Sequence, residues 1–217
     1  MLGDSLRRGC WSRWRCCGFI SPTTSSRAWT SRSSSCAARS ENAMPGQLRM
    51  TRTHYADLPP LDLPAGYALR CYGDGDEGAW ADVVNSVGDL GNYDAARARA
   101  FMMSKPQFDP EALQFITFEG TPVATACAWR DHAGETQLGQ LHMVAVDPAH
   151  RGKRLGTHVS TAVIRYFESH GFASLYLMTD DWRLPAVKTY LQLGFEPDMY
   201  DEDHHERWAK LRDTLGI

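Results

Sequence analysis

Apolar residues recur along the chain in two spacings, which predict strands and helices from about residue 66 onward. Short apolar runs bounded by Gly, Pro or Asp are typical of strands, and apolar residues three to four positions apart indicate one face of a helix. The strands predicted in this way are 67–71, 113–119, 121–129, 140–146 and 174–179, with one or two more near the C-terminus. The helices are predicted over 76–86, 94–103, 155–167 and from about residue 184. This order predicts a single α/β domain with a mixed central sheet flanked by helices.

A basic turn joins the strand 140–146 to the helix that follows it, in the segment Val146-Asp-Pro-Ala-His-Arg-Gly-Lys-Arg-Leu-Gly-Thr157. The first amides of a helix have no partner within the helix, and they carry a partial positive charge that attracts anions. Arg151, Lys153 and Arg154 add full charges beside them. We therefore expect a ligand that carries a pyrophosphate.

The turn matches neither of the common nucleotide-binding motifs, because it contains no G-x-x-x-x-G-K-[ST] and no G-x-G-x-x-G. Read with its strand, V-x-P-x-x-R-G-x-x-L-G resembles the coenzyme A loop of the GCN5-related N-acetyltransferases, whose core is [QR]-x-x-G-x-[GA]. Arg151 and Gly156 match the ends of that core, and Arg154 replaces its middle Gly. A side chain at 154 requires an ordinary negative φ or a strained positive one.

A second motif of the same family follows the strand 174–179. The family has N-x-x-A-x-x-x-Y-x-x-x-G-F at this distance from the loop, and Arg183 stands here in place of the Asn. The matching positions are Ala186, Tyr190, Gly194 and Phe195. The resemblance runs from about residue 66 to the C-terminus. It implies a single-domain acyl-coenzyme A N-acyltransferase fold and acetyl-coenzyme A as co-substrate.

The resemblance also implies where the co-substrate lies. The backbone of the strand would pair with the pantetheine arm, and the amides of the turn would hold the pyrophosphate. The residues assigned to this site are Val144, Ala145, Val146, Arg151, Gly152, Lys153, Arg154, Leu155, Gly156 and Thr157.

Acetyl transfer from a thioester needs a neutral amine and an acid for the leaving thiolate, and no covalent nucleophile is required when the reactants are held together. By resemblance, Tyr190 is that acid; its alternative role is a helix tyrosine that packs in the core. His142 is a candidate base, in a strand resembling that of arylalkylamine acetyltransferases, where two His alternate and Gln140 replaces the first. Its alternative role is a hydrogen-bonded buried His. Strand alternation would place Gln140, His142, Val144 and Val146 on one face.

Asp180 and Asp181 are further candidates for base or amine anchor, or they cap the helix that starts near Leu184. Arg183 is either a partner for a phosphate or carboxylate, or a solvated first-turn residue. The run of Asp203, His204, His205 and Glu206 has the chemistry of metal ligands. We expect these contiguous residues to be exposed and assign no metal.

The first fifty residues differ from the rest in charge and in cysteine content. They hold eight Arg, two acidic residues and four of the six Cys, whereas residues 51–217 hold 15 basic and 24 acidic residues. We expect a disordered tail over 1–50, a linker over 51–65 and the domain over 66–217. The tail is a transit peptide, or it precedes a true start at Met44 or Met50.

The sequence thus predicts a cytoplasmic acetyl-coenzyme A-dependent N-acetyltransferase acting on a small or peptidic primary amine by direct attack in a ternary complex. No apolar run is long enough for a membrane span, and an acidic domain favours a cationic amine over nucleic acid. Two alternatives remain: a protein or peptide acetyltransferase, and a sensor that binds acyl-coenzyme A without turnover. The oligomeric state stays open, a homodimer included.

Overall fold

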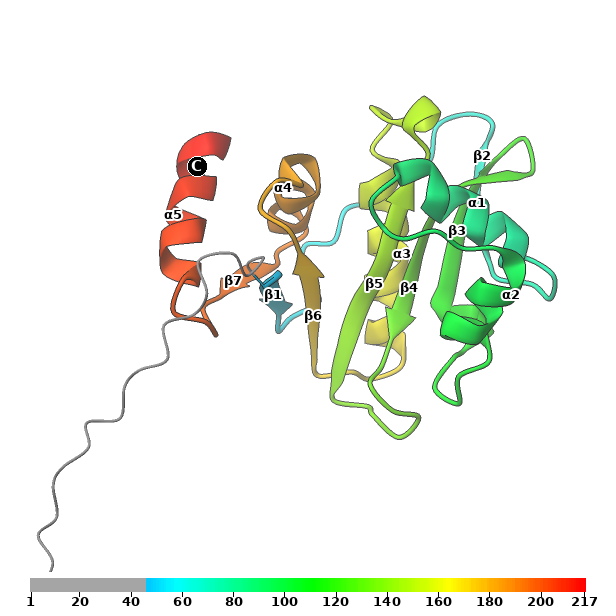
Figure 1. Cartoon of the computed structure of the whole chain (residues 1–217), viewed down its shortest axis with the longest axis horizontal. Helices are drawn as coiled ribbons and strands as arrows, with labels where there is room; N and C mark the ends of the chain where they lie inside the picture. Colours follow the sequence, from blue (N-terminus) through cyan, green and yellow to red (C-terminus); the bar gives the residue numbers. More distant parts are fainter. Residues whose placement is uncertain (1–45) are drawn as a thin grey trace, which may run out of the picture. The chain divides into compact units, whose positions relative to one another are not determined.

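The computed structural model describes residues 46–217, whose strands form one mixed sheet in the order β2-β3-β4-β5-β6-β1-β7 (Figure 1). The strands are β1 (Leu48–Arg52), β2 (Tyr67–Cys71), β3 (Leu113–Phe118), β4 (Thr121–Trp129), β5 (Leu138–Val146), β6 (Ser174–Thr179) and β7 (Glu196–Asp198). The helices are α1 (Glu77–Val87), α2 (Ala95–Ala98), α3 (Leu155–Ser169), α4 (Leu184–Gln192) and α5 (His204–Leu215), with short turns η1 (Arg99–Met103), η2 (Pro110–Ala112) and η3 (Pro148–His150). Neighbouring strands are antiparallel, except that β5 and β6 are parallel.

Two apolar cores lie on opposite faces of the sheet. Helices α1 and α2 cover β3 to β5 on one face, and α3 packs behind the same strands on the other (Figure 1). The helix spacing predicted for α3 is confirmed, because the apolar residues that recur three to four positions apart along it are buried, among them Leu155, Val159, Val163, Ile164 and Phe167. Within residues 46–217, no helix has both the length and the apolar character needed to cross a membrane.

The N-terminal boundary predicted for the domain is wrong. Residues 48–52, assigned to the tail and linker, form β1, which pairs with β6 and with β7. Leu48 and Met50 are fully buried, so this strand belongs to the core. Residues 53–66 then connect β1 to β2, which lies at the far edge of the sheet. Tyr55 anchors this connection by donating a hydrogen bond of 2.7 Å to the carbonyl of Phe172. The expectations for residues 1–45 lie outside the described part of the chain.

The C-terminal helix α5 was not predicted from the sequence. One strand, β7, follows α4 in the described residues, within the one or two that were expected, and α5 comes after it. Trp208 and Leu211 of α5 are buried in the core on the α3 side of the sheet. Their spacing continues to Leu215, which is a helical pattern that the sequence carried.

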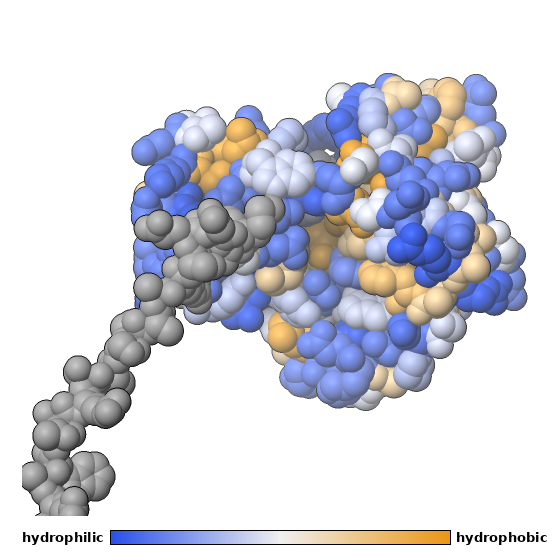
Figure 2. All heavy atoms as spheres, in the orientation of Figure 1, coloured by the Kyte–Doolittle hydropathy of each residue, from blue (hydrophilic) through white to orange (hydrophobic). Residues whose placement is uncertain are grey.

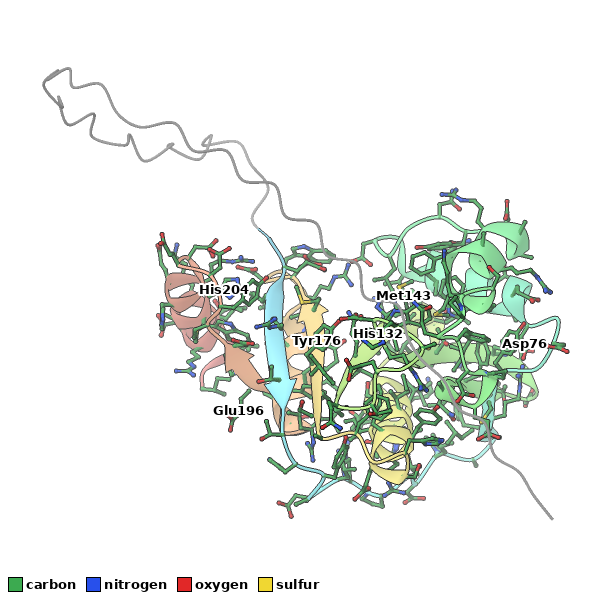
Figure 3. All side chains as sticks on the ribbon, turned by 90° about the horizontal axis from the view of Figure 1, so that it is seen from below. Asp76, His132, Met143, Tyr176, Glu196 and His204 are labelled. Carbon is green, nitrogen blue, oxygen red and sulfur yellow. The ribbon has the colours of Figure 1, made fainter. Side chains whose placement is uncertain are left out.

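Two irregularities in β5 open the sheet. A bulge lies at Met143 (Figure 3), whose φ is 51°, because Thr125 of β4 pairs with Ala145 while Cys127 pairs with His142. Strands β5 and β6 pair only from Leu138 to Gln140, so the second half of β5 has no partner on its β6 side. The surface is hollowed between the part that carries β6 and the part that carries β5 (Figure 2).

Candidate active site

The predicted phosphate turn lies between β5 and α3, and its unpaired amides are at the α3 end. Asp147 accepts a hydrogen bond of 2.9 Å from the amide of Ala149, which shapes the turn before the basic residues. The first backbone bond into α3 runs from the His158 amide to the Arg154 carbonyl, so the amides of residues 155–157 precede the intrahelical ladder. Arg151, Lys153 and Arg154 form no ion pair with any carboxylate among residues 46–217. The turn therefore offers both free donors and uncompensated positive charge.

Arg154 adopts the strained positive φ, one of the two backbone conformations considered for it from the sequence. Its φ and ψ are 59° and 20°, a left-handed conformation directly before α3. For a residue with a Cβ, this conformation costs roughly 1–2 kcal/mol. The turn thus keeps a geometry that suits Gly while presenting a guanidinium at the same position.

One cavity of about 540 Å³ joins the two sequence motifs. Most of the residues predicted to bind the co-substrate line it: Val144, Ala145, Val146, Arg151, Gly152, Arg154, Leu155, Gly156 and Thr157. Tyr190 lines the same cavity, together with Arg183 and Ala186 of the second motif. Lys153, His142 and Asp180 are not among the lining residues. The volume falls within the range of ordinary small-molecule sites.

Tyr190 presents a protonated hydroxyl to this cavity. Its ring is 8% exposed and packs at 67° to the ring of Phe195, with centroids 6.2 Å apart. No group among residues 46–217 forms a hydrogen bond with the hydroxyl. Burial raises the pKa of Tyr190 to about 12, although the charge of Arg183 opposes this rise. The hydroxyl can therefore donate at neutral pH.

His142 lies on the sheet face covered by α1 and α2. The prediction that Val144 and Val146 share this face is wrong. Its ring stacks on Phe101 at 6.1 Å and contacts Trp129 at 6.0 Å. Val144 and Val146 pack instead with the core on the α3 side, because the bulge at Met143 shifts the alternation by one residue. Burial lowers the pKa of His142 to about 4, so the imidazole is neutral at physiological pH.

The two Asp residues after β6 are already engaged with arginines. Asp180 lies 3.1 Å from Nε of Arg183 and accepts a 3.3 Å hydrogen bond from Gln47. Asp181 forms a bidentate pair with Arg207 of α5, which holds the pKa of Asp181 below its usual range. Arg183 is therefore paired with a carboxylate of the chain itself, and it also lines the cavity.

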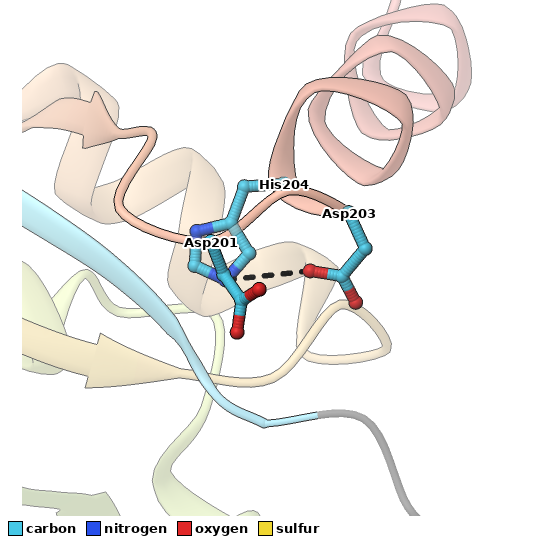
Figure 4. A group of neighbouring side chains, drawn as sticks. All are labelled: Asp201, Asp203 and His204. Carbon is cyan, nitrogen blue, oxygen red and sulfur yellow. Dashed lines mark ion pairs between the residues drawn. The ribbon is translucent and has the colours of Figure 1, made fainter. Parts of the chain in front are cut away.

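The candidate metal ligands near α5 lie outside this cavity. Asp201, Asp203 and His204 bring ligand atoms within 4.8 Å of one another (Figure 4). His204 is only 1% exposed, contrary to the expectation for this run, and its Nδ1 donates to the carbonyl of Asp198 at 3.1 Å. Its Nε2 lies 3.8 Å from Asp203, whose other oxygen faces Arg207. These contacts account for His204 as an anchor of α5.

Comparison with known proteins agrees with this geometry. The profile of the Acetyltransferase (GNAT) family matches residues 89–195, which include the phosphate turn and the second motif. The chain belongs to this family. A GCN5-related N-acetyltransferase from Sphaerobacter thermophilus superposes with a TM-score of 0.59 at 20% identity, covering 71% of this chain and 50% of that one. The sheet order and helices described above are thus a form of the GNAT fold.

The curated GNAT relatives that match are longer proteins. A mycothiol acetyltransferase from Pseudarthrobacter chlorophenolicus is 34% identical over 161 residues, which cover 69% of this chain and 48% of the relative. A mycothiol acetyltransferase from Nocardia farcinica is 31% identical, over 66% of this chain and 50% of the relative. The chain therefore spans about half the length of the curated relatives it matches.

Asp89 and Trp182 line the cavity without having been identified from the sequence. Asp89 lies in the loop after α1, and Trp182 precedes α4 with 62% of its surface exposed. Trp182 carried a usable signal, because it stands immediately before the second motif. Asp89 carried none, since an acidic residue beside Gly88 is ordinary loop composition.

Proposed function

We propose that the chain is an acetyl-coenzyme A-dependent N-acetyltransferase that acetylates a primary amine by direct attack, without a covalent enzyme intermediate. One observation carries the proposal: a single cavity joins the phosphate turn, the unpaired edge of β5 and the hydroxyl of Tyr190. The acceptor of the relatives is not carried over, because the chain spans only about half of their length.

The residues of the cavity suit the three chemical parts of acetyl-coenzyme A. Arg151, Arg154 and the amides of residues 155–157 would hold the pyrophosphate. The open edge of β5 near Val144 and Val146 offers backbone donors and acceptors to the pantetheine amides. Apolar side chains around Tyr190 would keep water from the thioester.

Acetyl-coenzyme A supplies the acetyl group as a thioester, and the chain supplies placement and proton handling. The amine nitrogen forms a bond to the carbonyl carbon, the carbon–sulfur bond breaks, and the amine loses a proton. Tyr190 would donate a hydrogen bond to the departing sulfur, because its hydroxyl stays protonated below a pKa of about 12.

His142 is the residue proposed to accept the amine proton, through a water molecule. It does not line the cavity itself, but Ala145, three residues further along β5, does. With a pKa of about 4, its imidazole is unprotonated and can accept a hydrogen bond at neutral pH. Such a weak base passes the proton on to solvent. We do not assign this role to Asp180, because Arg183 and Gln47 occupy its carboxylate.

The first test is a calorimetric titration of the whole chain with acetyl-coenzyme A. A Cβ on Gly156 would lie 3.7 Å from Val146, an ordinary contact, so Gly156→Ala folds and serves as the control. Gly156→Trp projects a large ring into the cavity and should abolish saturable binding. Thiol release with a panel of primary amines then distinguishes an enzyme from an acyl-coenzyme A sensor. No binding by the unaltered chain would refute the proposal.

A peptide acceptor is the second candidate, favoured by a separate hollow of about 420 Å³. It lies over β6 and β1 and is lined by Arg49, Thr51, Asp131, Leu138, Tyr176, Met178, Asp198 and Tyr200. Tyr176 and Met178 alternate with the buried Leu175 and Leu177, so they lie on the sheet face opposite α3. Acetylation of peptides at rates above those of small amines would select this alternative.

A cytoplasmic location is proposed with the activity. Cys71 and Cys127 are both free thiols, as expected for a reducing compartment.

A further inference from the structure

Two groups of charged residues lie at the cavity. In the phosphate turn, Arg151 and Arg154 have no carboxylate partner among residues 46–217. In the second group, Arg183, which also lines the cavity, lies between Asp89 and Asp180, at 3.5 Å and 3.1 Å. Two carboxylates and one guanidinium leave one uncompensated negative charge at neutral pH. The first group therefore suits phosphate, and the second suits a cation.

Within this cluster, Asp89 has hydrogen-bonding capacity to spare. The hydrogen bond from Arg183 goes to the backbone carbonyl of Asp89 at 3.2 Å, and no donor in residues 46–217 forms a hydrogen bond with its carboxylate. Asp180, by contrast, accepts from Gln47 and pairs with Arg183 at the shorter distance. Among the described residues that line the cavity, Asp89 is also the only one with a carboxylate. A ligand in the cavity thus meets a single acidic group.

The surroundings of Asp89 suit a cation further. Trp182 also lines the cavity and is 62% exposed, and the guanidinium of Arg183 lies over its ring, 4.7 Å from the centroid. The faces of aromatic rings attract cations. A carboxylate that is partly shielded from water also binds an ammonium group more strongly than a fully solvated carboxylate does. Val87 provides an apolar wall beside them.

We propose that Asp89 binds a second ammonium group of the acceptor, so that the substrates are diamines or other primary amines with a further cationic group. The inference rests on the proposed function and names its substrate class. The reacting amine must be neutral when it attacks, so it is not the charge that Asp89 holds. The second charge anchors the acceptor while the first nitrogen reaches the thioester.

The test compares 1,4-diaminobutane with 1-aminobutane, two probes of the same length that differ in one ammonium. Their binding to the whole chain is measured by calorimetry, with and without saturating coenzyme A. We expect the diamine to bind about fivefold more tightly, as for a partly exposed ion pair. Asp89→Asn should remove this preference, and Asp89→Glu should retain most of it. Equal binding of the probes by the unaltered chain, including no binding of either, would overturn the proposal.

Asp180→Asn is the matched control. This substitution also removes a carboxylate charge that pairs with Arg183, but Asp180 does not line the cavity. It should keep most of the diamine preference; a loss equal to that of Asp89→Asn would assign the effect to the general field and refute direct contact. Coenzyme A affinity is measured on every variant. Because the probes are followed by binding, a failure of acetyl transfer refutes the proposed function separately.

Discussion

The hydroxyl of Tyr67 in β2 lies 2.8 Å from Nδ1 of His150, the last residue of η3 before the phosphate turn. The His150 ring also packs edge-on against Tyr67 and lies 5.3 Å from the ring of Phe118. The edge strand farthest from β6 therefore fixes the conformation of the turn, although none of its residues lines the cavity.

Tyr67→Phe should loosen the phosphate turn. Removing one hydrogen bond should lower the free energy of unfolding by about 1 kcal/mol and weaken coenzyme A binding several-fold. Urea unfolding and calorimetry measure the two effects. Tyr55→Phe is the control, because Tyr55 donates a similar bond to Phe172, remote from the turn. If both variants changed coenzyme A affinity equally, the role of Tyr67 in the turn would be excluded.

Arg154→Gly should separate the effect of backbone strain on stability from the effect of the positive charge on coenzyme A binding. Glycine adopts φ near 59° without a Cβ clash, so the variant should be more stable by about 1 kcal/mol or less. Loss of the guanidinium should nevertheless weaken coenzyme A binding. Arg154→Lys retains both the charge and the strain and should leave both measurements close to those of the unaltered chain. A destabilised Arg154→Gly protein would mean that the left-handed conformation costs nothing here.

Tyr190→Phe should reduce kcat at least about tenfold, since a positioned acid commonly contributes more than that. Its hydroxyl makes no hydrogen bond within residues 46–217, and the ring packing on Phe195 is preserved. Stability and coenzyme A affinity should therefore stay unchanged. Steady-state thiol release with an amine from the screen measures the effect. Unchanged turnover would remove Tyr190 from the mechanism.

Stability should fall between pH 7 and pH 5 because of His142. Its folded pKa of about 4 lies below the unfolded value near 6.5, so the unfolded chain binds the proton first. The contribution is fully present above pH 6.5 and decreases as the pH falls toward 4, by about 2 kcal/mol at pH 5. His142→Gln should flatten this part of the curve of unfolding free energy against pH. A curve identical to that of the unaltered chain would contradict the buried neutral state.

A protein that starts at Met50 should be less stable than one that starts at Met44. The shorter version lacks Leu48, which is fully buried, and Arg49, which pairs with Asp198. Losing one buried leucine alone costs about 2–5 kcal/mol. Thermal unfolding of both versions tests this, and equal melting temperatures would show that β1 contributes little.

The core elements were predictable where periodicity is strong. The apolar spacing of α3 and the apolar runs of β3 to β6 predicted these elements, and many of the same residues are buried in the folded chain. The cavity was also predictable, because each of the two motifs that line it is a continuous stretch of sequence. The bulge at Met143 was not predictable, because methionine has no preference for positive φ and only the pairing with β4 reveals the extra residue. Met143 therefore reversed the predicted faces of Val144 and Val146.

Non-local arrangements also escaped prediction. A five-residue strand such as β1 has too few positions for alternation to distinguish it from a linker, and its partners are far away in sequence. Asp89 became a candidate only when folding brought its loop to Arg183. In both cases the decisive information is a contact between distant segments, which no local pattern records.

The place of β1 in the sheet has a consequence for how the chain is made. Leu48 pairs with Thr179, and Met50 pairs with Pro197, so β1, which is synthesised before the other strands described here, finds its neighbours only among residues 174–198. Until then, both its edges lack hydrogen-bonding partners, and pairings of such long range form slowly. Cotranslational folding can assemble β2 to β5 early, but β1 must wait until β6 and β7 have been synthesised.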